Sequence, residues 1–223
     1  MSSSQRILVI NPNTNAQITD NIRRCALAMV CASTDVVVSN PPAGPLSIET
    51  LADREAAIPQ VLALIERSLA ERYDAYVLAC FDDIALQEAR AMTSVPVVGT
   101  CEAGIAAARS VAERFSVVTT VHAAVPTIHG LLQRYGAQDI CTVHAAGIGV
   151  AEAATAGDAA AKRIEAALKT AIKQDGAKAI LLGSGGLIGR APSLQRRLGI
   201  PVIDGVLAAV VSAEGMARLR LQP

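Results

Sequence analysis

The amino-acid sequence predicts an α/β fold of two pseudo-symmetric lobes, each a parallel β-sheet flanked by helices, with the active site in the cleft between them. Apolar runs of strand length alternate along the 223 residues with segments of helical periodicity, which is typical of parallel strands joined by right-handed crossovers. Hydrophobic residues make up 52% of the chain and aromatic residues only 2%, so the core must be built from aliphatic side chains. The division into two lobes follows from an internal repeat.

The repeat carries a cysteine in one copy and a serine in the other. In the first copy an apolar run ends at Cys80, and Pro96 opens another apolar run sixteen residues later. In the second copy the corresponding run ends at Ser184, and Pro201 follows seventeen residues later. Two equivalent units would place Cys80 and Ser184 at equivalent strand ends, facing one another across a shared cleft. Such an arrangement suits chemistry on two sides of one small molecule.

The first half of the chain begins with a strand at residues 7–10, which is apolar throughout, as a strand covered on both faces should be. Thr14 and Gln17 then have the spacing of a capping box, and a helical stripe runs on to Met29. Further strands are expected at 36–38, 77–79 and 96–99, a Pro- and Gly-rich loop at 40–45, and helices at 58–69 and 101–113.

The second half repeats this alternation and closes with a helix. Strands are expected at 115–120, 140–144, 179–183 and 201–203, helices around 124–135, 164–172 and 190–198, and a flexible loop near 145–157. The terminal helix is expected to cross back onto the first lobe. The first lobe would then comprise residues 1–100 and 206–223, and the second lobe residues 101–205.

Composition and charge argue against several classes of function. Lys and Arg together number 20, as do Asp and Glu, so no net field favours nucleic acid or an anionic membrane. The start of the chain is polar, unlike a signal peptide, and no run of eighteen apolar residues occurs. Five cysteines without a C-x-x-C pair are expected to be reduced thiols. We therefore expect a cytoplasmic protein that acts on a small molecule, and its amphipathic helices suggest a homo-oligomer.

The sequence also lacks the usual marks of a cofactor. Neither glycine-rich nucleotide-binding motif occurs, so nucleotide cofactors are disfavoured. His122, His129 and His144 share no metal-ligand spacing, and no metal site is expected.

Small and polar side chains stand at the carboxyl ends of the predicted strands, where open α/β sheets bind ligands. These positions are also predicted helix starts, where free N–H groups favour anions and lower the pKa of a thiol. Two structural alternatives stay open, because Cys80 could be a buried core thiol and Ser184 a helix cap. The candidates are Asn13, Thr14, Cys80, Phe81, Asp82, Thr119, Thr120, Ser184, Gly185 and Gly186.

Motifs spread over nearly the whole chain carry a family resemblance. They are Ile10-Asn11-Pro12-Asn13-Thr14, Gly44–Glu49, Ala79–Asp83, Pro96–Gly99 with Glu102-Ala103, Val117–Thr120 and Pro201–Val206. In order and spacing they resemble the aspartate/glutamate/hydantoin racemase superfamily, and most closely its hydantoin and allantoin racemase branch. The resemblance implies an enzyme without a cofactor, in which two cysteines flank the substrate α-carbon. One cysteine removes the α-proton, and the other delivers a proton to the opposite face.

The chain departs from that branch at Ser184, where the branch has its second cysteine in a Leu-Gly-Cys-Gly-Gly motif. A serine hydroxyl is a far weaker acid than a thiol and needs a neighbouring base, and the sequence shows none beside Ser184. Three explanations are open: an engineered Cys→Ser variant, a natural single-cysteine member with a one-sided reaction, or a proton relay from Ser184 through water. A smaller departure lies at Asp83–Leu86, where the branch usually has a Pro-Gly-like pair.

The resemblance thus predicts a racemase of a small cyclic ureide, such as a 5-substituted hydantoin or allantoin. Cys80 would exchange the α-proton on one face, with Ser184 in place of the opposite base. Two other functions stay open: a single-cysteine decarboxylase or isomerase of an α-substituted carboxylic acid, and a binding protein without chemistry. Carbonyl oxygens would be held by N–H groups near Phe81, Asp82, Thr120, Gly185 and Gly186, ring amides by Asn13 and Thr14, and an apolar wall would come from Ile48.

Overall fold

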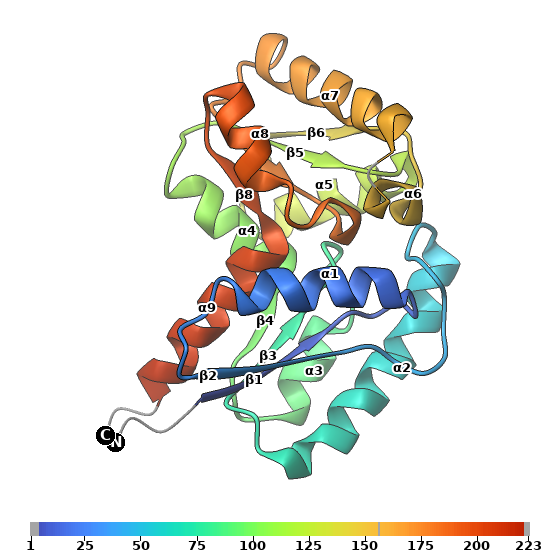
Figure 1. The fold of residues 1–223 in the computed structure, drawn as a ribbon, viewed down its shortest axis with the longest axis vertical. Helices are drawn as coiled ribbons and strands as arrows, with labels where there is room; N and C mark the ends of the chain where they lie inside the picture. The colour runs from blue at the N-terminus through green and yellow to red at the C-terminus, as the bar shows by residue number, and fades with distance from the viewer. Residues whose placement is uncertain (1–4, 156, 221–223) are drawn as a thin grey trace.

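Two parallel four-stranded sheets, one above the other in Figure 1, form the framework of the protein. This computed structural model describes residues 5–155 and 157–220. The first sheet has the strand order β2-β1-β3-β4, and the second has the equivalent order, β6-β5-β7-β8. The strands are β1 (Gln5–Ile10), β2 (Thr34–Ser39), β3 (Ala75–Leu78), β4 (Val97–Gly99), β5 (Phe115–Thr119), β6 (Cys141–Ala145), β7 (Ala179–Leu182) and β8 (Val202–Asp204). The predicted α/β fold class is confirmed.

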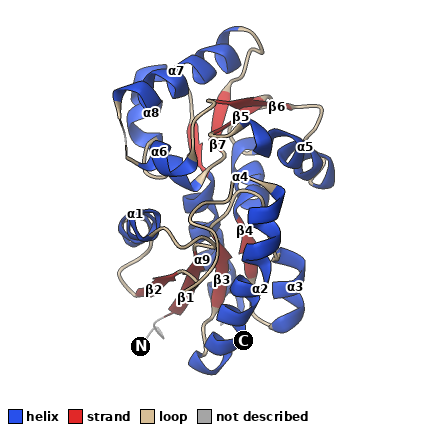
Figure 2. Ribbon diagram, turned by 90° about the vertical axis from the view of Figure 1, so that its right-hand side faces the viewer, coloured by secondary structure: helices blue, strands red, loops and turns tan. Residues whose placement is uncertain are grey.

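Helices cover both faces of each sheet, and we call each sheet with its helices a lobe (Figure 2). In the first lobe α1 and α9 pack on one face and α2 and α3 on the other. In the second lobe α6, α7 and α8 pack on one face and α4 and α5 on the other. The helices are α1 (Ala16–Leu27), α2 (Leu51–Ser68), α3 (Leu86–Met92), α4 (Thr100–Arg109), α5 (Val125–Arg134), α6 (Val150–Ala154), α7 (Asp158–Lys173), α8 (Ala191–Leu198) and α9 (Gly205–Arg220).

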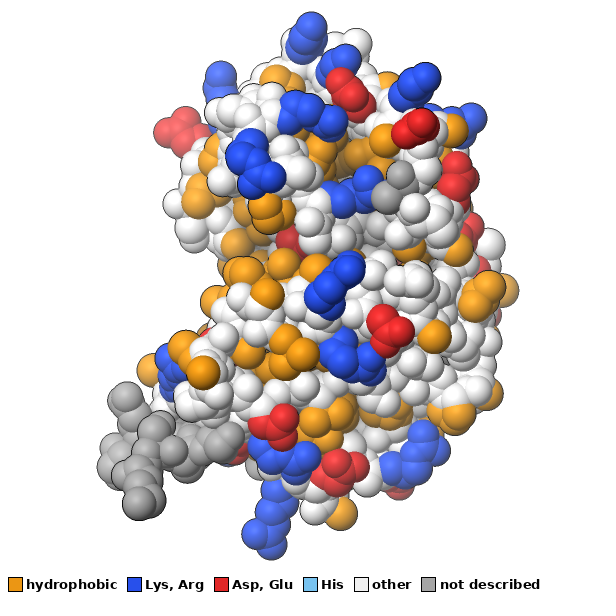
Figure 3. Space-filling model, in the orientation of Figure 1, with side chains coloured by type: hydrophobic (Ala, Val, Ile, Leu, Met, Phe, Trp, Pro, Cys, Tyr) orange, Lys and Arg blue, Asp and Glu red, His pale blue; other side chains and the backbone are white. Residues whose placement is uncertain are grey.

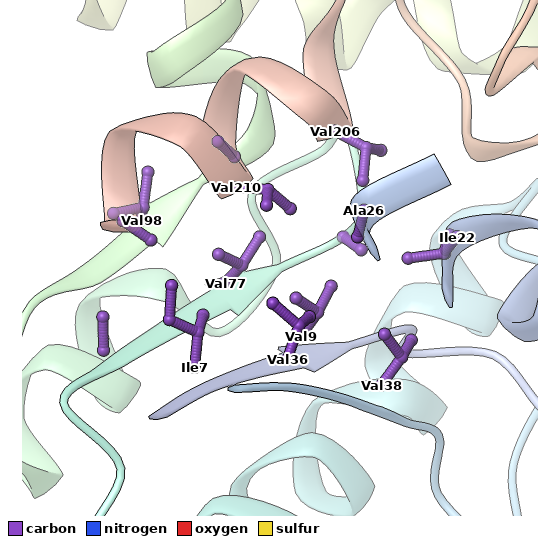
Figure 4. Packing of buried hydrophobic residues seen from close by; sticks show 14 of the residues in the cluster. Ile7, Val9, Ile22, Ala26, Val36, Val38, Val77, Val98, Val206 and Val210 are labelled. Carbon is purple, nitrogen blue, oxygen red and sulfur yellow. The ribbon is translucent and has the colours of Figure 1, made fainter. Parts of the chain in front are cut away.

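The core of the first lobe is aliphatic and includes the last helix of the chain. Buried Val9 and Val77 of the sheet lie in one cluster with Ile22 of α1 and Val210 of α9 (Figure 4). Burying one such side chain stabilises the fold by about 1.5–3 kcal/mol. Because α9 starts directly after β8 of the second sheet, it joins the two lobes.

Helix α4 also lies where the lobes meet, and it contacts both α9 and the strands β7 and β8. Gly104 permits this close approach: a Cβ atom there would lie 2.7 Å from Leu181 Cδ1 and 3.4 Å from Gly205 Cα. The 2.7 Å distance is shorter than real Cβ atoms show, so a larger residue at Gly104 would require the Leu181 side chain or α4 to shift.

Local capping differs from the sequence prediction at α1. The N-cap is Asn15, whose side chain accepts the N–H of Ile18 at 3.2 Å, so the capping box predicted at Thr14 and Gln17 is wrong by one residue. The Thr14 hydroxyl instead donates to the carbonyl of Pro45 at 3.2 Å, because the loop before α2 folds over it. The sequence predicts a flexible loop near 145–157, and its described part, 145–155 with 157, includes the short helix α6.

On the face of the molecule seen in Figure 3, charged side chains of neither sign gather in one region. Positive and negative side chains are interspersed across the face seen in Figure 3, and the outline narrows between the lobes on the side of α9. Apolar side chains, among them Met29, Ala208 and Val211, line a hollow of about 460 Å³ that borders α4, α8 and α9. Within the described ranges, none of the helices combines the length and apolar character that crossing a bilayer requires.

Candidate active site

A small cavity of about 40 Å³ lies between the lobes, at the carboxyl ends of the central strands. Parallel strands of both sheets end there, which is where open α/β sheets bind ligands. Cys80 follows β3 and Ser184 follows β7, so the two copies of the repeat meet at one cavity. The lining residues are Asn11, Pro12, Asn13, Ile48, Ala79, Cys80, Phe81, Asp82, Thr119, Thr120, Val121, Ala124, Val150, Gly183, Ser184 and Gly185.

The Cys80 thiol is half-buried in the wall from the first lobe. Desolvation by the surrounding protein raises the pKa of this thiol, and the negative charge of Asp82 raises it further. The backbone N–H of Asp82 and the positive charge of Arg54 act in the opposite direction and lower the pKa. At neutral pH the thiol is therefore largely protonated, and its reactivity depends on how well its thiolate is stabilised.

Asp82 is held by an ion pair that the sequence did not reveal. The Arg54 Nε donates to Asp82 Oδ2 at 2.7 Å, and the two side chains are only 14% and 8% exposed. Burial raises the pKa of Asp82, while the charge and hydrogen bond of Arg54 lower it.

Asp83 follows Asp82 in the turn after β3, where its N–H donates to the Cys80 carbonyl, and its side chain connects the lobes. Its carboxylate accepts the backbone N–H groups of Cys101 at 2.9 Å and Glu102 at 3.0 Å, both in the first turn of α4. The hydroxyl of Tyr135, at the end of α5, donates to the same carboxylate at 2.8 Å. Burial raises the pKa of Asp83 to about 6, although these hydrogen bonds lower it.

The wall from the second lobe centres on the Ser184 hydroxyl. Its oxygen accepts the hydroxyl of Thr120 at 3.1 Å and the backbone N–H of Gly186 at 3.3 Å. Both lone pairs of Ser184 Oγ are therefore occupied, and the hydroxyl proton is left as a donor. No carboxylate or imidazole bonds to Ser184 among the hydrogen bonds of the described chain. The hydroxyl also caps the 3₁₀ turn Gly185–Leu187, as the structural alternative anticipated.

Asn13 enters the cavity from the loop after β1. Its Oδ1 accepts Asn11 Nδ2 and the backbone N–H of Asn15, each at 3.0 Å, which fixes the amide plane. Asn13 Nδ2 takes part in none of the hydrogen bonds found among the described residues, so this amide can donate to a ligand carbonyl. Thr119 is turned away from that role, because its hydroxyl donates to the Gly183 carbonyl at 2.9 Å.

Two predicted substrate-binding residues lie outside the lining of the cavity. Thr14 is the first, since its hydroxyl and N–H both donate to the Pro45 carbonyl. Gly186 is the second, because its N–H is donated to Ser184 Oγ and a Cβ atom there would lie 2.5 Å from the Val150 carbonyl oxygen. Gly186 therefore allows α6 to pack against the 3₁₀ turn.

A hydrogen bond joins loops of the two lobes at one edge of the cavity. Glu49 Oε1 accepts the backbone N–H of Val150 at 2.8 Å and the Ser47 hydroxyl at 3.0 Å. Figure 1 shows the loop that leads into α2 lying beside α6. Ile48 and Val150, the neighbours in this contact, both line the cavity. Sequence patterns missed Val150, because a partner that contributes only a backbone N–H leaves no residue signature.

Within residues 5–155 and 157–220, no group of three or more His, Cys, Asp and Glu side chains is arranged to hold a metal ion.

Comparisons with known proteins agree with this architecture. The Asp/Glu/hydantoin racemase family matches residues 7–213. The hydantoin racemase of Rhizobium meliloti is 40% identical over 211 residues, covering 94% of this chain and 88% of the relative.

Solved structures extend the match. The allantoin racemase from Klebsiella pneumoniae superposes with a TM-score of 0.94 at 38% identity, covering 98% of this chain and 89% of that one. The allantoin racemase of Pseudomonas fluorescens gives a TM-score of 0.90 at 35% identity, with 97% and 92% coverage. The chain therefore belongs to the Asp/Glu/hydantoin racemase family, whose hydantoin and allantoin racemases are isomerases.

Proposed function

We propose that the protein exchanges the α-proton of a small cyclic ureide, a 5-substituted hydantoin or allantoin, without a cofactor. The observation that carries the proposal is the meeting of Cys80 and Ser184 at one cavity, each from the equivalent strand of its lobe. The named activities of the relatives at 36–40% identity support the ureide class.

In the proposed step the Cys80 thiolate removes the α-proton and becomes the neutral thiol. The electron pair of the C–H bond moves onto the adjacent carbonyl oxygen, where N–H groups near Phe81, Asp82 and Gly185 and the amide of Asn13 stabilise the charge. Returning the proton from the thiol regenerates the same enantiomer. Delivery to the opposite face would have to come from the side of Ser184.

Because one wall of the cavity carries Cys80 and the other Ser184, the two faces of a bound substrate would meet groups of different basicity. The Ser184 hydroxyl accepts from Thr120 and Gly186 and has no carboxylate or imidazole partner among the described residues, so it can donate to a ligand or water but lacks the base it would need to remove a proton. Exchange is therefore expected from the enantiomer whose α-proton faces Cys80. The rate should rise with pH, because burial raises the pKa of the thiol.

The test follows deuterium incorporation by NMR for each enantiomer of allantoin and of one 5-substituted hydantoin in D₂O, against a sample without enzyme. We expect one enantiomer to exchange above the control, Cys80→Ala to abolish this exchange, and Ser184→Cys to add exchange from the other enantiomer. Full exchange by Cys80→Ala would refute the role of the thiol. No exchange of either substrate would refute the ureide assignment.

A single-cysteine decarboxylase is the second candidate, and the donor-only state of the Ser184 hydroxyl favours it. Decarboxylation needs one protonation of the resulting carbanion and no second base. Release of carbon dioxide from a substituted malonate, together with no exchange of either ureide, would support this function over racemisation.

A further inference from the structure

Arg54 lies behind the cavity wall that carries Cys80. It belongs to the first turns of α2, 28 residues before Asp82 in the chain, yet its Nε approaches Asp82 Oδ2 to 2.7 Å. The guanidinium side chain is 14% exposed and the carboxylate 8% exposed, so water screens this pair weakly. Arg54 is absent from the lining of the cavity, whereas Asp82 and Cys80 both belong to it.

The charges around Cys80 oppose one another. Asp82 and Asp83 disfavour a thiolate at Cys80, and Arg54 favours one. Arg54 also holds the Asp82 side chain in the turn after β3, and the Asp82 backbone N–H lowers the pKa of the Cys80 thiol. Without Arg54 the Asp82 carboxylate would lose its counter-charge, and a thiolate at Cys80 would lose the favourable charge of Arg54.

We propose that Arg54 is a positioning residue that controls ionisation of the Cys80 thiol through its ion pair with Asp82. The importance of Arg54 for turnover rests on the proposed function of Cys80. The effect of Arg54 on thiol ionisation does not rest on that function, because alkylation measures ionisation without any substrate.

The experiment measures the rate of Cys80 alkylation by iodoacetamide from pH 7 to 10 in the intact protein. Peptide mass spectrometry separates Cys80 from Cys25, Cys31, Cys101 and Cys141. The variants are Arg54→Gln, Asp82→Asn and the double variant. Arg67→Gln, an exposed arginine on the same helix, serves as the matched control.

The expected order of thiol ionisation follows from charge alone. Arg54→Gln should slow alkylation at pH 8 about tenfold, equivalent to about one pKa unit. Asp82→Asn should accelerate it, and the double variant should lie near the wild type. Arg67→Gln should leave the rate unchanged. If the ion pair only supported the local structure, both single variants would be alkylated more slowly than the wild type. Combining the two substitutions would then not restore the alkylation rate.

The outcomes separate this inference from the proposed function. If Arg54→Gln alkylates within twofold of the wild type, or Asp82→Asn alkylates more slowly than the wild type, the inference is wrong. If the alkylation rates follow the predicted order while neither ureide exchanges its α-proton, the role of Arg54 in thiol ionisation is supported and the proposed function is refuted. Arg54→Lys preserves the charge and should keep most of the wild-type rate even where Arg54→Gln folds poorly.

Discussion

The carboxylate of Glu49 accepts the backbone N–H of Val150 at 2.8 Å, and this hydrogen bond joins loops of the two lobes beside the cavity. The chain itself crosses between the lobes at α4 and α9, so the Glu49 contact is an additional, non-covalent connection. Ile48 and Val150, which lie next to this hydrogen bond, line the cavity, so the contact fixes both loops at its edge.

Replacement of Glu49 tests this connection. Glu49→Ala removes the acceptor of the Val150 N–H, so hydrogen exchange at amide 150 should become faster, and the free energy of unfolding should fall by about 1 kcal/mol. Glu49→Gln retains a carbonyl acceptor and should exchange close to the wild type. Glu55→Ala, an exposed carboxylate on α2, is the control. Unchanged protection at Val150 in Glu49→Ala would show that this contact does not hold the loops together.

Ala85 occupies a left-handed backbone conformation, with φ of +59° at the N-cap of α3. This conformation costs a residue with a Cβ atom about 1 kcal/mol, and glycine avoids the cost. Ala85→Gly should therefore raise the free energy of unfolding by about 0.5–1 kcal/mol, measured by urea denaturation. Ala56→Gly, at an exposed position inside α2, should lower it by about 1 kcal/mol. A loss of stability in Ala85→Gly would mean that the Ala85 methyl contributes more by packing than the strain costs.

Asp83 should make stability depend on pH. Its carboxyl pKa is about 6 in the folded protein, above the value of about 3.9 for an unfolded chain. Folding thus favours the protonated form, whose contribution is fully present below about pH 4 and is lost as the pH rises through about 6.

Asp83→Asn removes this titration. The difference in unfolding free energy between the wild type and the variant should fall by on the order of 2 kcal/mol from pH 4 to pH 7. Urea denaturation across this range measures the difference. A difference that grows with pH would mean that the hydrogen bonds from Cys101, Glu102 and Tyr135 outweigh the desolvation of the carboxylate.

Thr119 should stabilise the strand end that carries Ser184. Its buried hydroxyl donates to the Gly183 carbonyl at 2.9 Å, and Thr119→Val leaves that carbonyl without this donor. The substitution should lower the free energy of unfolding by about 1–2 kcal/mol. The Thr170 hydroxyl donates to the Ala166 carbonyl within α7, and Thr170→Val should change the free energy of unfolding by less than about 0.5 kcal/mol. Equal effects of the two substitutions would refute a special role for Thr119.

The sequence predicted the alternating strands and helices well because buried parallel strands are short apolar runs, as at 7–10 and 77–79. It also placed Cys80 and Ser184 at equivalent strand ends, since a repeat in sequence implies a repeat in topology. Details of capping were less accessible. Thr14 has the right residue type for an N-cap, but the chain starts α1 one residue later and uses Thr14 to bind the Pro45 carbonyl.

Long-range partners could not be read from local patterns. Arg54 and Asp82 are brought together by the packing of α2 against the first sheet, and no periodicity connects them. Glu49 and Val150 are 101 residues apart, and one of the two groups is a backbone N–H, which every residue except proline has. Residues around a cavity that act through the backbone therefore emerge only once the fold is known.

Helix α9 also constrains the order in which the chain can fold during synthesis. The core between β1 and α9 joins residues such as Ile7 and Ala213, close to opposite ends of the chain. Glu214 adds to this connection by accepting the backbone N–H of Cys31 at 3.0 Å. The first sheet is translated first, yet the part of its apolar face that α9 covers stays exposed until Gly205–Arg220 have been made. The second lobe, whose strands and covering helices lie between α4 and β8, can complete its core before α9 has been made, so it is expected to mature before the first lobe.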